Sequence, residues 1–224
     1  MQTLLLLDLD GTIIDTPHYE AWRNVGRQIE GQELSYEQYI ACIAGRPREE
    51  GASRLLALQK TASCDAQIRS RAVCALAQSK QREFLRLSEQ ADLFEDAWRL
   101  LLRIQKAGQH AKFYTASQNA PRLFDAALRR AGVLCGMQVE VVRQQPDQSR
   151  EALFHFLLGD IKPDFVTLID DSPYSVDLAC CMGIRAGQIR RNELHTVASN
   201  PGCIIFSSLD ELNIPLGTTW GVGI

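Results

Sequence analysis

Two carboxylates separated by a single residue follow the first apolar segment of the chain. Asp8 and Asp10 come directly after a run of four leucines at residues 4–7, and Gly11 follows them. The leucine run is typical of a strand that is buried on both faces, and side chains two positions apart at its end point to the same side. Two like charges held so close are costly unless a cation lies between them or one is protonated. The pair therefore indicates a metal site or an acid–base pair, and the alternative is a solvated Asp-Gly turn.

Later apolar segments end in residues of similar chemistry. Asp170 and Asp171 close the run at residues 165–169, and Thr115 closes the short run at residues 111–114. In a parallel α/β sheet, ligands gather beyond the carboxyl ends of the strands. Carboxylates that meet at one such edge need a hard cation, and oxygen ligands select Mg²⁺. The Thr115 hydroxyl and the amides of the helix that follows can bind phosphate oxygens, although an ordinary strand-end cap is the alternative for Thr115.

These positions are predicted to be held by alternating strands and helices. Strands are expected at residues 4–8, 111–114, 139–142, 165–169, 187–189 and 203–206, and helices at 98–106, 119–132, 148–158 and 176–182. This alternation predicts an α/β fold, a Rossmann-like doubly wound parallel sheet. Asn119 is expected to cap the helix that follows it. The segment from residue 213 to residue 224 gives no assignment.

A helical segment interrupts this alternation directly after the first strand. Ser35 and Gln38 have the form of a capping box, and Asp65 caps a long helix through about residue 90. The apolar row of that helix, on which Lys80 also falls, consists of Ile68, Ala72, Leu76, Phe84 and Leu87. We predict an α/β core domain formed by residues 1–15 and 93–224 and an inserted all-α cap domain formed by residues 16–92, acting as a lid.

Composition narrows the class of protein further. The 224 residues are 46% apolar and 23% charged, which is the balance of a soluble globular protein. A net charge of −3 gives no reason to expect a nucleic acid or an anionic membrane as partner. No apolar run approaches the roughly 20 residues of a membrane span, and the leucine run lacks the basic stretch of a signal peptide. The 7 cysteines form no Cys-x-x-Cys pair, which predicts free thiols in a cytoplasmic protein.

The segment Asp-Leu-Asp-Gly-Thr at residues 8–12 resembles the first motif of the haloacid-dehalogenase superfamily of phosphotransferases. The resemblance implies that Asp8 attacks phosphorus and that Asp10 serves as general acid and base. The dehalogenases of the superfamily lack the second aspartate, so Asp10 argues against dehalogenation.

Thr115 and the Asp170–Asp171 pair match the second and fourth motifs of the same superfamily. On that match Asp8 and Asp171 would hold Mg²⁺ by their side chains. Asp10 would hold it by its carbonyl, and Asp170 directly or through water.

The third motif departs from the family pattern. The family has a lysine at the start of the helix before the Asp-Asp strand, and Arg143, followed by Gln-Gln-Pro-Asp, stands in that place. Lys112 and Lys162 precede their strands and are expected at the opposite edge of the sheet. Arg143 can offset charge on the phosphoryl oxygens and on Asp8, although its planar guanidinium differs from an ammonium. We expect the site to have adapted to Arg143, and weakened turnover is the alternative.

The helical segment resembles the cap of β-phosphoglucomutase-like sugar-phosphate phosphatases and mutases. His18 lies in a similar cap segment, and Arg48 occupies the basic position of a loop similar to their specificity loop. Lys80 stands where the mutases have a cap lysine. The alternatives are a surface or core histidine, a solvated arginine and a snorkelling lysine.

The stretch after Thr115 follows the same pattern, with Ala116, Ser117 and Asn119 at substrate-binding positions. These features predict Mg²⁺-dependent phosphoryl transfer through an aspartyl phosphate, with hydrolysis of a small phosphorylated metabolite such as a sugar phosphate. A β-phosphoglucomutase-type phosphomutase is the alternative, and two residues missing before His18 favour the phosphatase. A non-catalytic protein that binds a phosphorylated ligand is the rival of another class, and Arg143 is the feature that favours it.

Overall fold

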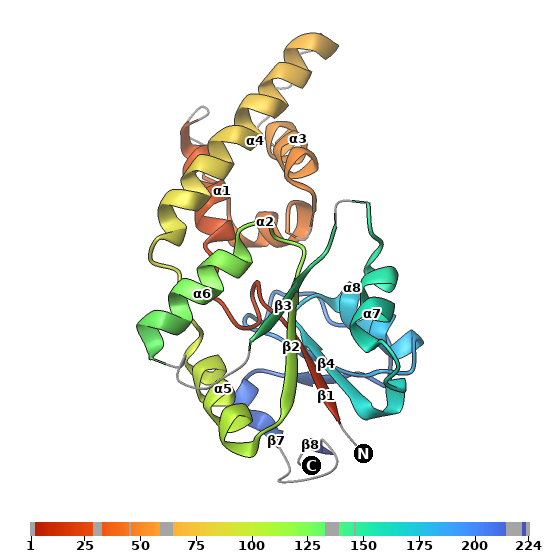
Figure 1. Ribbon diagram of the computed structural model, residues 1–224. Helices are drawn as coiled ribbons and strands as arrows, with labels where there is room; N and C mark the ends of the chain where they lie inside the picture. Colours follow the sequence, from red (N-terminus) through yellow and green to blue (C-terminus); the bar gives the residue numbers. More distant parts are fainter. Residues whose placement is uncertain are drawn as a thin grey trace. The chain divides into compact units, whose positions relative to one another are not determined.

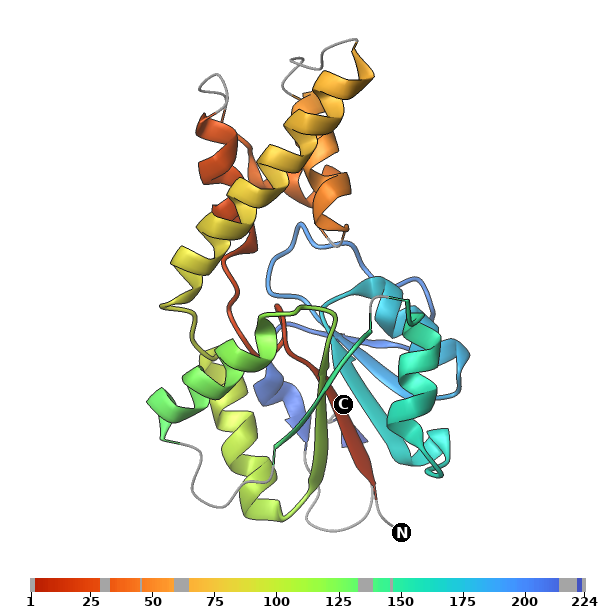
Figure 2. The ribbon, with the colours of Figure 1, turned by 45° about the horizontal axis from the view of Figure 1, so that its top comes forward.

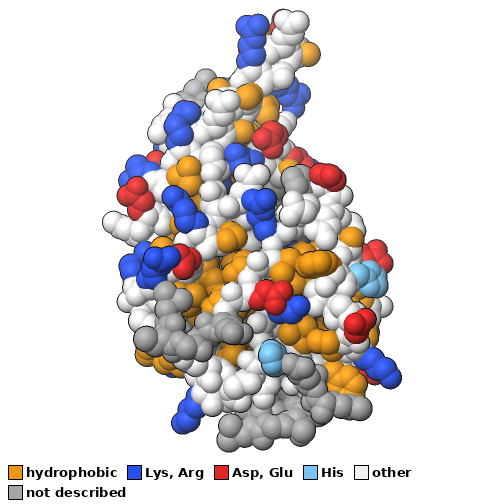
Figure 3. All heavy atoms as spheres, viewed as in Figure 1, with side chains coloured by type: hydrophobic (Ala, Val, Ile, Leu, Met, Phe, Trp, Pro, Cys, Tyr) orange, Lys and Arg blue, Asp and Glu red, His pale blue; other side chains and the backbone are white. Residues whose placement is uncertain are grey.

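The computed structural model describes residues 3–28, 33–44, 46–58, 65–132, 139–145, 147–213 and 221–222. The chain divides into two compact units, a core unit of Met1–Thr16 with Asp92–Ile224 and a helical unit of Pro17–Ala91 (Figures 1 and 2). No helix in the described ranges is long and apolar enough to cross a membrane. On the face drawn in Figure 3, basic and acidic side chains are interspersed.

Parallel strands form the central sheet of the core unit, in the order β3-β2-β1-β4-β5-β6. They are β1 (Leu4–Asp8), β2 (His110–Thr115), β3 (Glu140–Arg143), β4 (Val166–Asp170), β5 (Arg185–Ile189) and β6 (Ile204–Phe206). β1 pairs with β2 on one side and with β4 on the other, and all its residues are buried because its apolar side chains suit both faces of the sheet. This strand order is that of a doubly wound sheet, so the predicted fold class is confirmed.

Helices cover both faces of this sheet. They are α5 (Glu95–Ala107), α6 (Ala120–Ala131), α7 (Arg150–Leu158) and α8 (Pro173–Cys181). Figures 1 and 2 show α5 and α6 on one side and α7 and α8 on the other. Leu153 of α7 and Val176 of α8 belong to the apolar cluster that contains Leu4 and Leu6 of β1. The side chains of β1 therefore point alternately towards the helices on the two faces of the sheet.

The C-terminal part of the core unit adds two short elements. A 3₁₀ helix at Leu209–Glu211 leads into β7 (Leu212–Asn213), which pairs antiparallel with β8 (Gly221–Val222). The remainder of the unassigned C-terminal segment lies outside the described residues, as do Cys64 and Cys135. The other cysteines are free thiols.

The helical unit has an apolar core of its own. Its helices are α1 (His18–Gln28), α2 (Tyr36–Cys42), α3 (Arg48–Leu58) and α4 (Ala66–Ser88). The core is made by residues from every one of these helices or their ends, among them Trp22, Val25, Ile43, Leu55 and Leu76. A separate core is what an insertion needs in order to fold as a unit.

The helix starts in this unit follow the predicted capping residues. Ser35 and Gln38 form the capping box, and the Asp65 side chain accepts from the amides of the first turn of α4. The predicted apolar row of α4 is wrong at its beginning, because Ile68 is 57% exposed. Leu76 and Phe84 of the row are buried, and Ala72 is partly buried against the core of the helical unit.

Candidate active site at the carboxyl edge of the sheet

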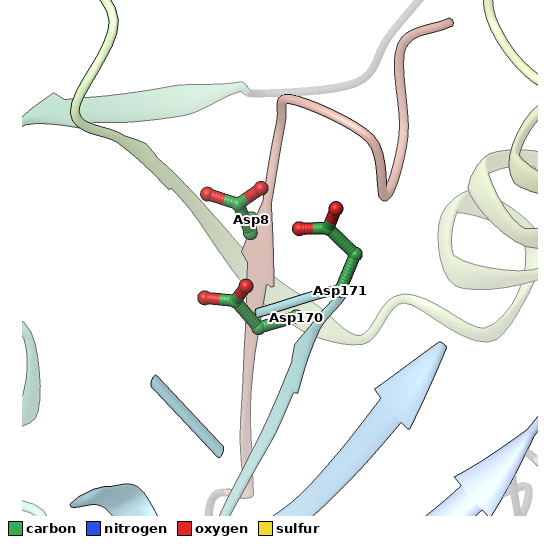
Figure 4. Close-up of side chains that lie close together, drawn as sticks. All are labelled: Asp8, Asp170 and Asp171. Carbon is green, nitrogen blue, oxygen red and sulfur yellow. The ribbon is translucent and has the colours of Figure 1, made fainter. Parts of the chain in front are cut away.

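Carboxylates from two adjacent strands meet at the carboxyl edge of the core sheet. Asp8 ends β1, Asp170 ends β4, and Asp171 follows it. One carboxylate oxygen of each lies within 4.8 Å of the others (Figure 4). The register aligns Leu7 of β1 with Ile169 of β4, so the residues that follow them come together. The structure thus brings together three of the predicted acids.

The electrostatics of this cluster favour a bound cation. Asp8 and Asp170 are buried. Burial, followed by the charges of Asp170, Asp171 and Asp10, raises the pKa of Asp8 well above its usual value. Burial and the charges of Asp170 and Asp10 likewise raise the pKa of Asp171. Because all ligand atoms are carboxylate oxygens whose negative charges repel one another, the cluster fits a hard divalent cation such as Mg²⁺.

Asp10 is held by the end of β2. The Thr115 hydroxyl donates to Asp10 Oδ2 at 2.7 Å and accepts from the Ser117 amide at 2.8 Å. Thr115 is fully buried. Since a hydroxyl has one proton, Thr115 orients the Asp10 carboxylate here and would have to release it to donate to a phosphate.

The loop between β2 and α6 contains the other predicted substrate-binding residues of the core unit. Ser117 Oγ accepts from the amides of Asn119 at 3.2 Å and Ala120 at 3.3 Å. Asn119 is the N-cap residue of α6, as predicted, but its side chain makes no cap hydrogen bond. Ala116 is exposed beside them. Substrate binding by Ala116, Ser117 and Asn119 stays a prediction.

The structure does not bring Arg143 into the acid cluster. Arg143 ends the edge strand β3, and its side chain is exposed and has no ion-pair or hydrogen-bond partner among the described residues. The cation whose charge lowers the pKa of Asp8, against the larger effects that raise it, is Arg150. Arg150 is the first residue of α7, which is the helix that precedes the Asp170–Asp171 strand.

Arg150 is absent from the residues that the sequence motifs predict, although the sequence carries a signal for it. The Pro-Asp dipeptide that follows the family lysine points to Arg143 instead. The cap of α7 would have located it better, because Ser149 Oγ accepts from the Ala152 amide at 3.1 Å and makes Arg150 the first helical residue. Arg150 Nη1 is buried and has no hydrogen-bond partner in the described part of the chain, so it can donate to a ligand.

The predicted cap residues lie in the helical unit. Lys80 Nζ is 2.9 Å from His18 Nδ1 and 4.5 Å from the centre of the Phe84 ring, on which His18 stacks. Lys80 is 5% exposed, so the alternative of a snorkelling lysine is wrong. Arg48 is partly buried at the start of α3 and has no ion-pair or hydrogen-bond partner among the described residues, whereas the neighbouring Arg46 pairs with Glu50. The substrate-binding roles of these residues stay predictions.

A doubly wound core with a helical insertion after β1 is the fold of solved haloacid-dehalogenase-like hydrolases and β-phosphoglucomutases. An archaeal β-phosphoglucomutase from Pyrococcus sp. strain ST 04 is 21% identical, with 94% of this chain and 95% of that chain covered and a TM-score of 0.71. A predicted phosphoglycolate phosphatase from Haemophilus somnus 129pt is 12% identical, with 94% and 96% covered and a TM-score of 0.71.

A third similar structure was solved with ligands bound. It is a hydrolase of the same family from Deinococcus radiodurans R1 with bound phosphate and sodium, 16% identical, with 92% of this chain and 91% of that chain covered and a TM-score of 0.66. No family model and no curated protein matches this chain. The shared fold confirms the architecture that the sequence resemblance implied.

Proposed function

We propose that the protein is a Mg²⁺-dependent phosphotransferase that hydrolyses a small phosphorylated metabolite, such as a sugar phosphate. The observation that carries this proposal is the buried cluster of Asp8, Asp170 and Asp171 at the carboxyl edge of the sheet. Asp10 beside it and the positive charge of Arg150 add the acid–base group and the cation that phosphoryl transfer needs. The fold shared with phosphatases and phosphomutases supports the same class of reaction.

The mechanism assigns the two aspartates of β1 and its following turn to successive steps. A carboxylate oxygen of Asp8 attacks phosphorus while Asp10 gives a proton to the leaving oxygen, which yields the alcohol and an aspartyl phosphate. Asp10 then takes a proton from water, which attacks the same phosphorus, releases inorganic phosphate and regenerates Asp8. The Thr115 hydroxyl keeps the Asp10 carboxylate in one orientation through both steps.

Charge compensation comes from the groups around Asp8. Asp8, Asp170 and Asp171 would hold Mg²⁺, with Asp10 contributing its carbonyl. When bound, the ion offsets negative charge on the carboxylates and on the transferring phosphoryl group. Arg150 adds a fixed positive charge and the buried Nη1 as a hydrogen-bond donor.

A phosphomutase of the β-phosphoglucomutase type is the second candidate. It is favoured by the Pyrococcus structure, which bears that name, and by the hydrogen-bonded His18–Lys80 pair in a cap segment that resembles the mutases. The two reactions differ in whether water or a sugar hydroxyl attacks the aspartyl phosphate. The non-catalytic alternative loses its main argument, since Arg150 supplies the charge that Arg143 does not.

One screen tests the proposal. Phosphate release from an aryl phosphate and a panel of sugar phosphates is measured with Mg²⁺ and with EDTA, and glucose 1-phosphate to glucose 6-phosphate conversion is followed in parallel. We expect Mg²⁺-dependent phosphate release, and sugar-phosphate isomerisation without release would favour the mutase. If the wild-type protein binds Mg²⁺ but shows neither activity, the result would favour the non-catalytic ligand-binding protein.

A further inference from the structure

Tyr114 reaches the acid cluster from the core of the sheet. Its hydroxyl donates to Asp170 Oδ2 at 2.6 Å, and Tyr114 is fully buried. We propose that Tyr114 is a positioning residue, whose hydroxyl fixes the Asp170 carboxylate for metal binding. This inference rests on the proposed function, because it assigns Asp170 to Mg²⁺.

The alternation of side chains along β2 explains how an aromatic residue comes to lie there. Phe113 points to one face of the sheet and packs against Phe124, with ring centres 4.8 Å apart. Tyr114, the next residue, belongs to the cluster on the opposite face and meets the Phe154 ring edge-on at 5.6 Å. The ring is therefore held by the core, while the hydroxyl reaches the edge of the sheet where Asp170 ends β4.

Asp170 receives one donor on each carboxylate oxygen. The Ser172 amide donates to Oδ1 at 2.8 Å, and the Tyr114 hydroxyl donates to Oδ2. These two donors, one on each oxygen, hold the carboxylate in this orientation. Each oxygen keeps a second lone pair for a cation, so these bonds orient Asp170 without blocking it. Partners of this kind typically contribute tenfold to a hundredfold to metal affinity or activity.

The ring of Tyr114 also contacts the cation of the site. The guanidinium carbon of Arg150 lies 5.7 Å from the ring centre. A phenylalanine keeps this contact, the packing on Phe154 and nearly all of the side-chain volume. Tyr114→Phe therefore removes the hydrogen bond to Asp170 and little else.

Mg²⁺ binding to purified Tyr114→Phe, measured by titration calorimetry, tests the proposal. We expect the dissociation constant for Mg²⁺ and the Mg²⁺ concentration for half-maximal phosphatase activity to rise about tenfold. The kcat at saturating Mg²⁺ should change less than about threefold, because Asp8, Asp10 and Arg150 are untouched. A purely structural tyrosine would lower the melting temperature and leave Mg²⁺ affinity unchanged.

Two control variants separate positioning from packing. Tyr19→Phe removes a hydroxyl that donates to the Leu34 carbonyl in the helical unit, and Phe124→Leu loosens the packing of Phe113 on the opposite face of the sheet. Both should bind Mg²⁺ within about twofold of wild type, although Phe124→Leu should melt at a lower temperature. If Tyr114→Phe binds Mg²⁺ as tightly as the wild type, the inference about Tyr114 is overturned and the proposed function is not affected. Failure of the wild type to bind Mg²⁺ and to turn over any phosphate ester overturns the proposed function instead.

Discussion

Asp8 is both the proposed nucleophile and a source of electrostatic cost in the metal-free protein. We predict that Asp8→Asn lowers turnover at least a thousandfold while the free energy of unfolding without Mg²⁺ stays equal or rises. Asparagine keeps the volume, but it removes a buried carboxylate whose pKa is raised by burial and by the charges of Asp170, Asp171 and Asp10. Turnover and thermal melting in EDTA measure the two effects.

An exposed acid provides the control for this substitution. Asp125 pairs with Arg129 on the surface of α6, and Asp125→Asn should change neither turnover nor melting appreciably. Asp8→Asn activity within tenfold of wild type would contradict the assignment of the nucleophile.

The two arginines before the Asp-Asp strand form a matched pair. We expect Arg150→Ala to lower kcat about a hundredfold, as the loss of one preorganised charge-stabilising donor does. Arg143→Ala should stay within about twofold of wild type, because Arg143 is exposed and lies outside the acid cluster. The reverse result would restore the sequence-based assignment of Arg143. Steady-state kinetics on one aryl phosphate decide between the two.

At the residue scale, the sequence predicts the three acids that the structure brings together, but not Arg150, whose charge acts on Asp8. Asp8, Asp170 and Asp171 follow apolar strands, and a parallel sheet brings strand ends together whatever the details of the loops. Arg150 lies on a helix, where the direction of a side chain depends on the residue at which the helix begins. The Pro-Asp dipeptide points to Arg143, whereas α7 begins at Arg150.

Among the elements, the turn after β1 sets the distance between Asp8 and Asp171. Gly11 has φ +80°, and a Cβ added there would lie 2.4 Å from Asp171 Oδ2. We predict that Gly11→Ala displaces the Asp171 carboxylate and weakens Mg²⁺ binding about tenfold or more, as measured by calorimetry.

Gly108 at the end of α5 is the control for Gly11. Its φ is +61°, and a Cβ there would meet no atom within 4 Å. Gly108→Ala should therefore cost about 1–2 kcal/mol in stability and leave Mg²⁺ affinity unchanged. Equal Mg²⁺ affinity in both variants would show that the Gly11 turn does not shape the site.

The Asp96 carboxylate at the start of α5 connects this helix with Arg191, which follows β5, and with the 3₁₀ helix at Leu209–Glu211. Burial alone would raise the pKa of Asp96, but hydrogen bonds from Arg191, the Leu209 amide and Ser208 hold it below the usual value. Because the folded pKa is lowered, this stabilisation is present above the unfolded pKa and is lost as the pH falls through the folded one.

Substitution of Asp96 should expose this pH dependence. We predict that Asp96→Asn costs about 2 kcal/mol near neutral pH, the size of a hydrogen bond to a charged group. The difference from wild type should shrink as the pH falls from about 5 towards 2. Urea unfolding at several pH values measures it, and a difference independent of pH would contradict an ionised Asp96.

Strand positions were the most predictable feature at the element scale. Each predicted strand of the sheet is present within two residues of its expected ends, since apolar runs and Gly-rich turns are local signals. Ile68 is exposed, against the prediction, because the distance by which α4 extends past its neighbouring helices is not a local signal.

For the whole molecule, ligand binding should raise the thermal stability of the folded protein. We predict that beryllium fluoride with Mg²⁺ raises the melting temperature by several degrees, because a ligand at a hundredfold excess over its dissociation constant adds about 2.7 kcal/mol. The Asp8→Asn variant should show no added effect of fluoride beyond Mg²⁺ alone. No shift in the wild type with both present would count against a phosphoryl-transfer site.

The position of β1 has a consequence for biosynthesis. β1 ends at Asp8, but its first partner strand begins at His110, and the helical unit of Pro17–Ala91 lies between them. At about 5–20 residues per second on the ribosome, the four-leucine segment waits on the order of 5–20 seconds for that partner. The helical unit, whose core is internal, can fold in this interval. The apolar β1 segment of the nascent chain is therefore without its partner strand while the helical unit is synthesised and folds.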